Sequence, residues 1–102
     1  MRVAGFDWDE GNWPKCGKHG LSKAEIEAVF ANAPRVHADP KHSAHEQRLR
    51  AIGLTLEGKY AFVVFTIRQR GGKRYIRPIS ARYMHRKEVA QYEEEMARLV
   101  KR

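Results

Sequence analysis

The clearest pattern of hydrophobic and polar residues lies in the second half of the chain. Residues 60–67 form an uncharged run that is rich in β-branched and aromatic side chains. This run is short for a buried helix, and its composition favours a strand covered on both faces. The chain then turns at Gly71 and Gly72 and returns over residues 74–82, where aliphatic side chains alternate with arginine. The pattern predicts a β-hairpin, and Pro78 predicts a bulge or a sheet edge in its second strand.

Two helices are predicted upstream of this hairpin. Ser22 and Glu25 match the capping-box pattern S-x-x-E, in which each side chain accepts a hydrogen bond from the other residue's backbone N–H. The helix that begins there runs to about Asn32, and its buried stripe consists of Ile26, Val29 and Phe30. An earlier helix is predicted over residues 9–18, with basic residues in its last turn and a glycine after it.

The remaining segments complete an α+β pattern. Strands are predicted over residues 3–8, 35–38 and 46–55, with turn residues at 39–44. Apolar residues at helical spacing predict a last helix over residues 85–101, with a stripe made of Val89, Tyr92, Met96 and Leu99. We therefore expect a single domain over residues 1–102, in which an antiparallel twisted sheet of four to five strands carries two N-terminal helices and a C-terminal helix packed on it.

Composition places this domain in a reducing compartment. The single cysteine, Cys16, has no partner for an internal disulfide. We see no signal peptide, and the longest apolar run is far shorter than the ~20 residues that a membrane helix needs. The expected location is the cytoplasm, without membrane association.

Positive charge is concentrated in the second half of the chain. The net charge is +8; residues 1–45 carry six basic and six acidic side chains, whereas residues 46–102 carry fourteen basic and six acidic ones. Such an asymmetry is typical of proteins that bind polyanions, with RNA or DNA as the leading candidates. An acidic protein partner, or a surface that only keeps the protein soluble, would produce the same asymmetry.

Several segments together resemble the BrnT family of type II toxin–antitoxin toxins. The matching pieces, in chain order, are Phe6-Asp7-Trp8-Asp9, Lys18-His19-Gly20-Leu21-Ser22, Ala28-Val29-Phe30, Asp39-Pro40-Lys41-His42-Ser43, Glu46-Gln47-Arg48, Ile79-Ser80-Ala81-Arg82 and the residues from Glu88 to Glu93. Two positions depart from the family's usual pattern, Trp13-Pro14 in the first helix and Met84 after the Ser-Ala-Arg segment.

The resemblance implies a RelE-like fold and an endoribonuclease that cleaves cellular RNA and inhibits translation without a cofactor. It also implies a BrnA-like ribbon-helix-helix antitoxin that neutralises the toxin, in a complex expected to be a heterotetramer. Operator DNA would then be bound only through the antitoxin. A non-catalytic module that binds nucleic acid or an acidic protein is the alternative.

RNA cleavage of this kind needs cations that stabilise the phosphorane, a base for the 2′-OH and an acid for the leaving oxygen. Arg82 ends a predicted strand and is the first candidate for the phosphate, although it could instead pair with Glu88. Arg48 and Arg68 follow, because antiparallel pairing would bring their strand ends together. Either could also be an ordinary exposed side chain at a sheet edge.

The candidates for proton transfer are Glu46 and His19, with His42 and His45 as two more. Glu46 is the carboxylate nearest to these arginines, but neighbouring cations weaken a carboxylate as a base, and it could form a salt bridge instead. His19 is the alternative acid or base, or else a helix cap. The spacing of His37, His42 and His45 matches no familiar metal site, so we expect no bound metal. Further RNA contacts are expected from Lys18, Lys41, Arg50, Arg77, Tyr83 and Arg86, with Tyr83 stacking on a base.

Overall fold

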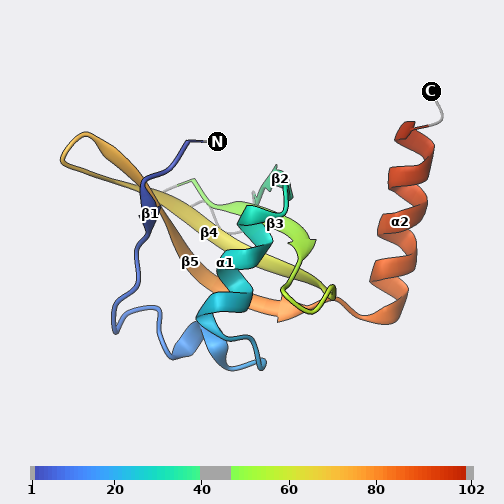
Figure 1. The fold of residues 1–102 in the computed structure, drawn as a ribbon, viewed down its shortest axis with the longest axis horizontal. Coiled ribbons are helices and arrows are strands. Elements are labelled where there is room, and N and C mark those ends of the chain that lie inside the picture. Colours follow the sequence, from blue (N-terminus) through green and yellow to red (C-terminus); the bar gives the residue numbers. More distant parts are fainter. Residues whose placement is uncertain (1, 40–46, 101–102) are drawn as a thin grey trace.

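The computed structural model describes residues 2–39 and 47–100 and contains one five-stranded sheet, in the order β1-β5-β4-β3-β2 (Figure 1). The strands are β1 (Gly5–Phe6), β2 (Arg35–Ala38), β3 (Leu49–Leu54), β4 (Tyr60–Arg70) and β5 (Lys73–Tyr83). The α-helices are α1 (Lys23–Ala31) and α2 (Arg86–Val100), and a short 3₁₀ helix, η1, spans Lys15–Gly17. The predicted α+β class is confirmed.

The central hairpin forms as its glycines predict. Arg70 pairs with Lys73, and Gly71 and Gly72 between them have φ values of 57° and 76°. These left-handed values are the ones that a two-residue hairpin turn requires. Further along, Val64 pairs with Ser80 but Phe65 pairs with Pro78, so one extra residue is accommodated on β5. The bulge predicted at Pro78 is therefore present.

Helix α1 begins with the predicted capping box. The Ser22 Oγ accepts from the Glu25 backbone N–H at 3.1 Å, and the Ser22 N–H donates to Glu25 Oε1 at 3.1 Å. Ile26 and Val29 are fully buried against the sheet. The helix can approach β3 this closely because Gly53 has no side chain: a Cβ there would lie 3.1 Å from the carbonyl oxygen of Val29.

The prediction of a helix over residues 9–18 is wrong. This segment forms turns and only the short η1, because its polar side chains bind the backbone in a non-helical arrangement. The Asp9 N–H donates to Asn12 Oδ1, and the buried Asn12 Nδ2 donates to the carbonyl oxygens of Asp7 and Pro78, each at 2.9 Å or less. Pro14, without an N–H, further limits a regular helix.

The sheet is mixed rather than purely antiparallel. Gly5 pairs with Tyr75 and Phe6 with Ile76 in parallel orientation, so β1 lies beside β5 at the edge. Of the strand predicted over residues 3–8, only Gly5–Phe6 forms a strand. The hydrophobic pattern marks an extended segment, but strand direction depends on where the long connection returns the chain, which that pattern does not encode.

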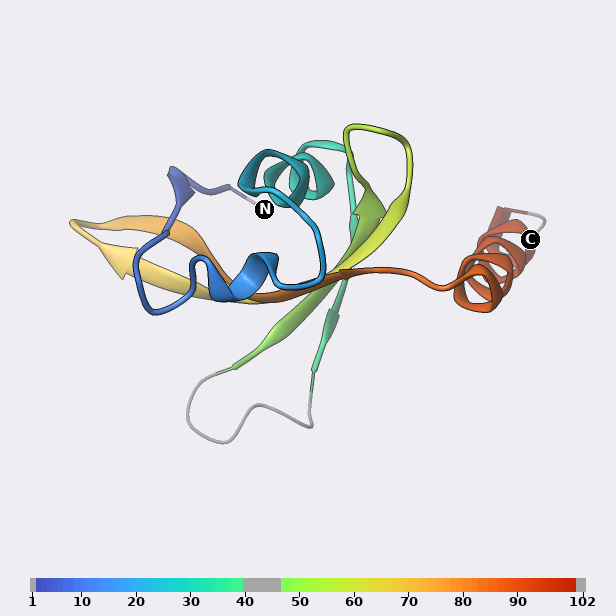
Figure 2. The ribbon, with the colours of Figure 1, turned by 90° about the horizontal axis from the view of Figure 1, so that it is seen from below.

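Helix α2 touches the end of the sheet and does not cover it (Figures 1 and 2). None of its residues is buried. The Tyr92 ring meets the Tyr60 ring edge-on at 5.3 Å, and an Arg35 guanidinium nitrogen lies 3.5 Å from the Met96 sulfur. The predicted packing of this helix on the sheet is thus limited to the contacts of Tyr92 and Met96. Leu99, further along the same apolar stripe, remains 48% exposed.

Among the described residues, no helix is long and apolar enough to cross a membrane.

Candidate functional site

The two faces of the sheet carry different chemistry. One face packs against α1 and η1 (Figure 2) and bears the core, which includes Val63, Phe65 and Ile76. Directly paired residues of antiparallel strands point to the same side of a sheet, and side chains alternate along each strand. The strand register, continued by one residue to Arg48, therefore places a group of basic side chains together on the opposite face, which we call the arginine face: His37, Arg48, Arg50, Arg68 and Arg82, with Phe62 and Val64 between them.

Phe62 is the centre of the arginine face. It pairs with Arg82 of β5, while Arg50 of β3 pairs with Val64, two residues further along β4. The guanidinium carbon of Arg82 lies 4.6 Å from the centroid of the Phe62 ring, and that of Arg50 lies 5.5 Å from it. Both distances are within the range of a cation–π contact. Two cations from two strands therefore converge on one aromatic ring.

Arg82 is also held by Glu88 in the first turn of α2. Its two terminal nitrogens donate to the two carboxylate oxygens of Glu88 at 2.8 and 2.9 Å. Glu88 Oε1 accepts a further hydrogen bond from the backbone N–H of His85, at 2.9 Å. Hydrogen bonding from Arg82, and then from His85, lowers the pKa of Glu88 to about 2. The pairing with Glu88 that the sequence left open is present, with Arg82 still 39% exposed.

This ion pair predicts a pH-dependent contribution to stability. Because the pKa of Glu88 is about 2 in the folded protein and 4.5 ordinarily, the pair stabilises the fold above about pH 4.5 and is lost as the pH falls toward 2. We expect Glu88→Gln to lower the free energy of unfolding by about 0.5–1 kcal/mol at pH 7. Urea titrations of both proteins from pH 7 down to 3 should show this difference shrinking. A difference that stays constant with pH would contradict the prediction.

Arg48 and Arg68 lie toward the other end of the arginine face. Leu49 pairs with Phe65, and the Thr66 hydroxyl donates to the carbonyl oxygen of Gln47, so the start of β3 adjoins the later part of β4. The predicted proximity of the two strand ends is confirmed. From Phe62 to Arg68 the strand advances roughly 20 Å. These two arginines therefore share a face with Arg82 but not its immediate surroundings.

His37 is a side chain of the arginine face that sequence reasoning did not select for catalysis. It is exposed on β2 and pairs directly with Arg50 of β3. Only the strand register reveals this placement, because thirteen positions separate the two residues in the chain. Imidazole is the side chain that serves most often as a general acid or base in catalysis.

Other predicted contact residues lie elsewhere. Tyr83 points to the α1 side, where its hydroxyl donates to Glu25 and raises the pKa of Tyr83 to about 12. Lys18 and the exposed His19 follow η1, in the loop that reaches Tyr83 at Gly20. The structure therefore does not bring His19, Lys18 or Tyr83 together with Arg82. The predicted residues Glu46 and Lys41, and also His42 and His45, fall outside the described part of the chain.

Arg77 belongs to an ion-pair cluster at the β1–β5 edge. Its guanidinium donates to Asp9 at 3.0 and 3.1 Å and to the buried Asp7 at 3.3 Å, and Arg70 also pairs with Asp7 at 3.0 Å. The Arg77 side chain is only 15% exposed. This cluster ties β1 to the hairpin and accounts for Arg77 without RNA. Arg86 is exposed at the start of α2.

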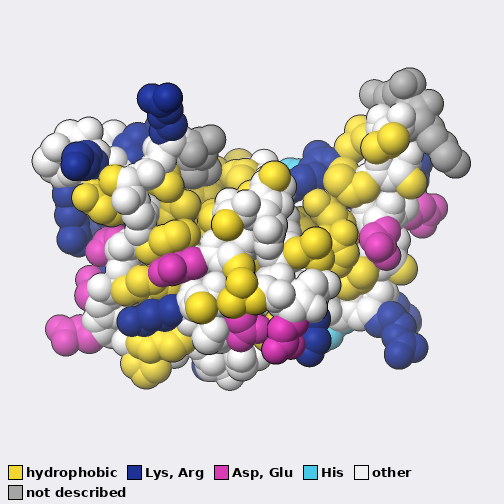
Figure 3. All heavy atoms as spheres, in the orientation of Figure 1, with side chains coloured by type: hydrophobic (Ala, Val, Ile, Leu, Met, Phe, Trp, Pro, Cys, Tyr) yellow, Lys and Arg dark blue, Asp and Glu magenta, His cyan; other side chains and the backbone are white. Residues whose placement is uncertain are grey.

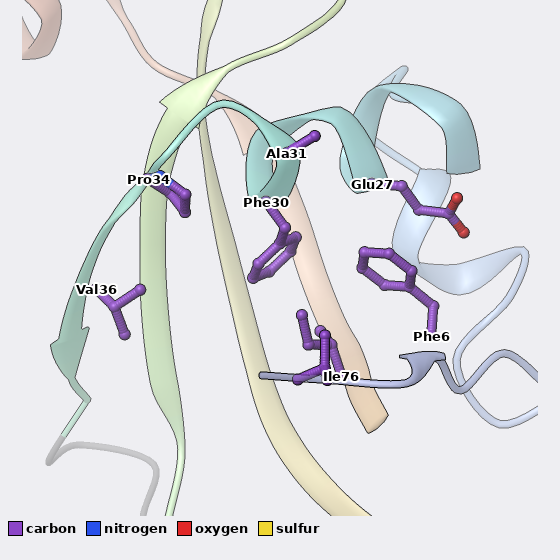
Figure 4. A pocket seen from close by; sticks show the side chains of 8 residues that line it. Phe6, Glu27, Phe30, Ala31, Pro34, Val36 and Ile76 are labelled. Atoms are coloured by element: carbon purple, nitrogen blue, oxygen red, sulfur yellow. The ribbon is translucent and has the colours of Figure 1, made fainter. Parts of the chain in front are cut away.

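The α1 side contains an apolar pocket of about 330 Å³ (Figure 4). Phe6, Phe30, Val36 and Ile76 contribute to its lining, and Glu27 is the one acidic residue there. The carboxylate of Glu27 accepts from the Trp8 indole N–H at 2.8 Å. Basic side chains on this side are dispersed among acidic and apolar ones (Figure 3). Neither the pocket nor the dispersed charges on this side bring several basic side chains together, as binding of a phosphate would require.

Metal and thiol chemistry have no site in the described residues. No group of three or more histidine, cysteine, aspartate or glutamate side chains within residues 2–39 and 47–100 is placed to hold a metal ion. Cys16 is buried in the core, and this burial raises the pKa of its thiol to about 11. A thiol with so high a pKa is a poor nucleophile.

Several arginines on one sheet face of a small α+β domain are a feature typical of the class of polyanion-binding proteins. Comparison with protein-family models narrows this class: the model for the ribonuclease toxin BrnT of type II toxin–antitoxin systems matches residues 8–88. The chain therefore belongs to the BrnT family of ribonuclease toxins, as its sequence pattern suggested. A search of curated proteins finds no match.

Proposed function

We propose that this protein is an endoribonuclease that cleaves cellular RNA on its arginine face, through attack of a 2′-OH on the adjacent phosphate, and thereby inhibits translation. The observation that carries the proposal is the convergence of Arg50 and Arg82 on Phe62 in a chain of a ribonuclease toxin family. Guanidinium groups match the phosphate in charge and in hydrogen-bond geometry. They also stabilise the additional negative charge of the transition state.

Different arginines of the arginine face contact different phosphates of the RNA, according to their position along β4. Arg50 and Arg82 act at the scissile phosphate. Arg48 and Arg68 contact neighbouring phosphates of the same strand, because roughly 20 Å separates Phe62 from Arg68 along β4. A requirement for the 2′-OH makes RNA, and not DNA, the substrate. The bidentate pair between Arg82 and Glu88 must open before Arg82 can donate both nitrogens to a phosphate.

His37 is the proton-transfer group that we propose from the described residues, with Glu46 retained as the alternative base. His37 is exposed directly opposite Arg50, whereas His19 lies on another part of the surface. We expect His37→Gln to lower the single-turnover cleavage rate by about 100-fold. The exposed His85, outside the arginine face, provides the control substitution His85→Gln. An unchanged rate in His37→Gln would assign proton transfer to another group.

The activity is tested on matched oligonucleotides. Purified protein should cleave a single-stranded RNA of mixed sequence in the presence of EDTA, and leave products with a 2′,3′-cyclic phosphate. The same sequence with 2′-deoxyribose throughout should stay intact. Cleavage of both, or of neither, would refute the proposed chemistry. Binding of both oligonucleotides without cleavage would instead favour the non-catalytic nucleic-acid-binding alternative.

The proposed partner is a BrnA-like ribbon-helix-helix antitoxin, joined to the toxin in a heterotetramer in the cytoplasm. A type II toxin–antitoxin family implies an antitoxin, and the identity and stoichiometry proposed here follow the family resemblance. Operator DNA would be bound through the antitoxin. Co-expression with the product of the adjacent reading frame should abolish RNA cleavage, and the mass of the purified complex would give the stoichiometry.

A further inference from the structure

Phe62 separates two arginines that come from opposite sides of its strand. Arg50 lies on β3 and Arg82 on β5, and β4 runs between them. The half-buried Phe62 ring lies within 5.5 Å of both guanidinium carbons, measured from its centroid. Phe62 is therefore the one described side chain for which two cation–π contacts to arginine are found.

The core does not account for this ring. Phe65, three residues along the same strand, is fully buried and meets Phe30 edge-on at 4.9 Å on the α1 side. Phe62 points to the other side, and the hydrophobic core cluster of the described residues does not include it. The ring interactions found for Phe62 among the described residues are with two cations, so its removal changes the surroundings of both guanidinium groups.

A fixed pair of arginines binds phosphate better than a flexible pair. Long side chains lose rotamer freedom when a ligand orders them, and contacts that order them beforehand reduce that loss. Arg82 has further contacts, from Glu88 and from the carbonyl oxygen of Tyr83. For Arg50, the side-chain interaction found within residues 2–39 and 47–100 is the contact with Phe62.

We propose that Phe62 is a positioning residue, which holds Arg50 and Arg82 at a set separation so that both engage the same stretch of RNA backbone. This inference rests on the proposed use of the arginine face for RNA. Phe62 acts through the two guanidinium groups and takes no part in bond breaking. It contributes to affinity by ordering charges and leaves their number unchanged.

The test uses binding, so that it does not depend on cleavage. The probe is a single-stranded RNA oligonucleotide with 2′-O-methyl groups throughout, which cannot undergo 2′-OH attack. We expect Phe62→Leu to weaken its binding by roughly fivefold to thirtyfold, because binding must then order two long side chains that the ring no longer holds in place. Phe62→Tyr, which retains the ring, should bind within about twofold of the wild type. Tyr60→Leu removes another aromatic ring, which contacts α2, and should also bind within about twofold.

Salt dependence separates positioning from loss of charge. Removing one phosphate contact, as in Arg50→Ala, should reduce the slope of log K against log salt concentration by about 0.7. Phe62→Leu should weaken binding with an unchanged slope, because both arginines still reach the phosphates. In NMR spectra of the free protein, the side-chain N–H signals of Arg50 and Arg82 should lose their ring-current shifts in Phe62→Leu and keep them in Phe62→Tyr. Phe62→Met serves the same comparison should Phe62→Leu not fold.

Three results would overturn the inference: wild-type affinity in folded Phe62→Leu, an equal loss in Tyr60→Leu, or a slope that falls as in Arg50→Ala. Failure of the proposed function looks different. Wild-type protein that binds the methylated RNA with the expected Phe62 effects but cleaves no unmodified RNA refutes the nuclease and leaves the positioning role intact. Wild-type protein that does not bind the oligonucleotide refutes both.

Discussion

Arg82→Ala should lower the single-turnover rate of RNA cleavage by about 100-fold to 1,000-fold. Arg82 presents two parallel N–H donors, which Glu88 occupies in the free protein, and loss of one stabilising donor at a transition state has an effect of this size. Arg82→Lys keeps the charge but loses the planar pair of donors, so we expect an intermediate rate. The measurement is a single-turnover assay with saturating protein, which separates the chemical step from binding.

Two controls accompany this substitution. Arg74→Ala removes an exposed positive charge from the same strand and should cleave at nearly the wild-type rate. Glu88→Gln removes the ion pair while leaving Arg82 in place, and so distinguishes a loss of fold from a loss of the phosphate contact. In cells, induced wild-type protein should arrest growth and Arg82→Ala should not. If Arg74→Ala were as damaging as Arg82→Ala, general charge and not a defined site would explain the activity.

Phe65→Ala should destabilise the protein by about 3–5 kcal/mol. The Phe65 side chain is fully buried between the sheet and α1, in edge-on contact with Phe30. Proteins have a total stability of about 5–15 kcal/mol, so this loss is a large fraction of the total and should clearly lower the midpoint of thermal unfolding. Thermal and urea unfolding followed by circular dichroism would measure the effect.

Phe62→Ala is the matched comparison for Phe65→Ala. It truncates the same residue type on the same strand, but on the arginine face, where the ring is half-buried. We expect Phe62→Ala to lower the free energy of unfolding by less than half as much as Phe65→Ala. The loss of RNA-binding free energy in Phe62→Ala should exceed its loss of unfolding free energy. Equal losses of unfolding free energy in the two variants would mean that the arginine face supports the fold as much as the core face does.

Local signals predicted the elements that depend on local interactions. The capping box of Ser22 and Glu25 determines where α1 begins, and Gly71 and Gly72 determine where the hairpin turns, because each is a short-range requirement of the backbone. The sequence did not predict the 3₁₀ segment, because the conformation there depends on a hydrogen bond from Asn12 to Pro78, which is 66 positions away in the chain. The parallel pairing of β1 and the limited packing of α2 likewise depend on tertiary contacts.

The sequence indicated the arginines of the candidate site but neither their arrangement nor the roles proposed here for His37 and Phe62. The basic second half of the chain and its strand-end arginines pointed to Arg48, Arg68 and Arg82 before the fold was known. Their common face follows only from the register of three strand pairs, and so does the position of His37 opposite Arg50. A residue type can suggest its chemistry, whereas convergence of side chains depends on a register that a one-residue shift would reverse.

Glu88 accepts hydrogen bonds from both Arg82 and the His85 backbone, and this double role connects α2 to the proposed phosphate site. A ligand that withdraws Arg82 from Glu88 changes the free energy of the first turn of α2, and by thermodynamic reciprocity anything that strengthens that turn changes the affinity for the ligand by the same factor. The outermost helix of the molecule is thus energetically coupled to events on the sheet, although it covers almost none of it.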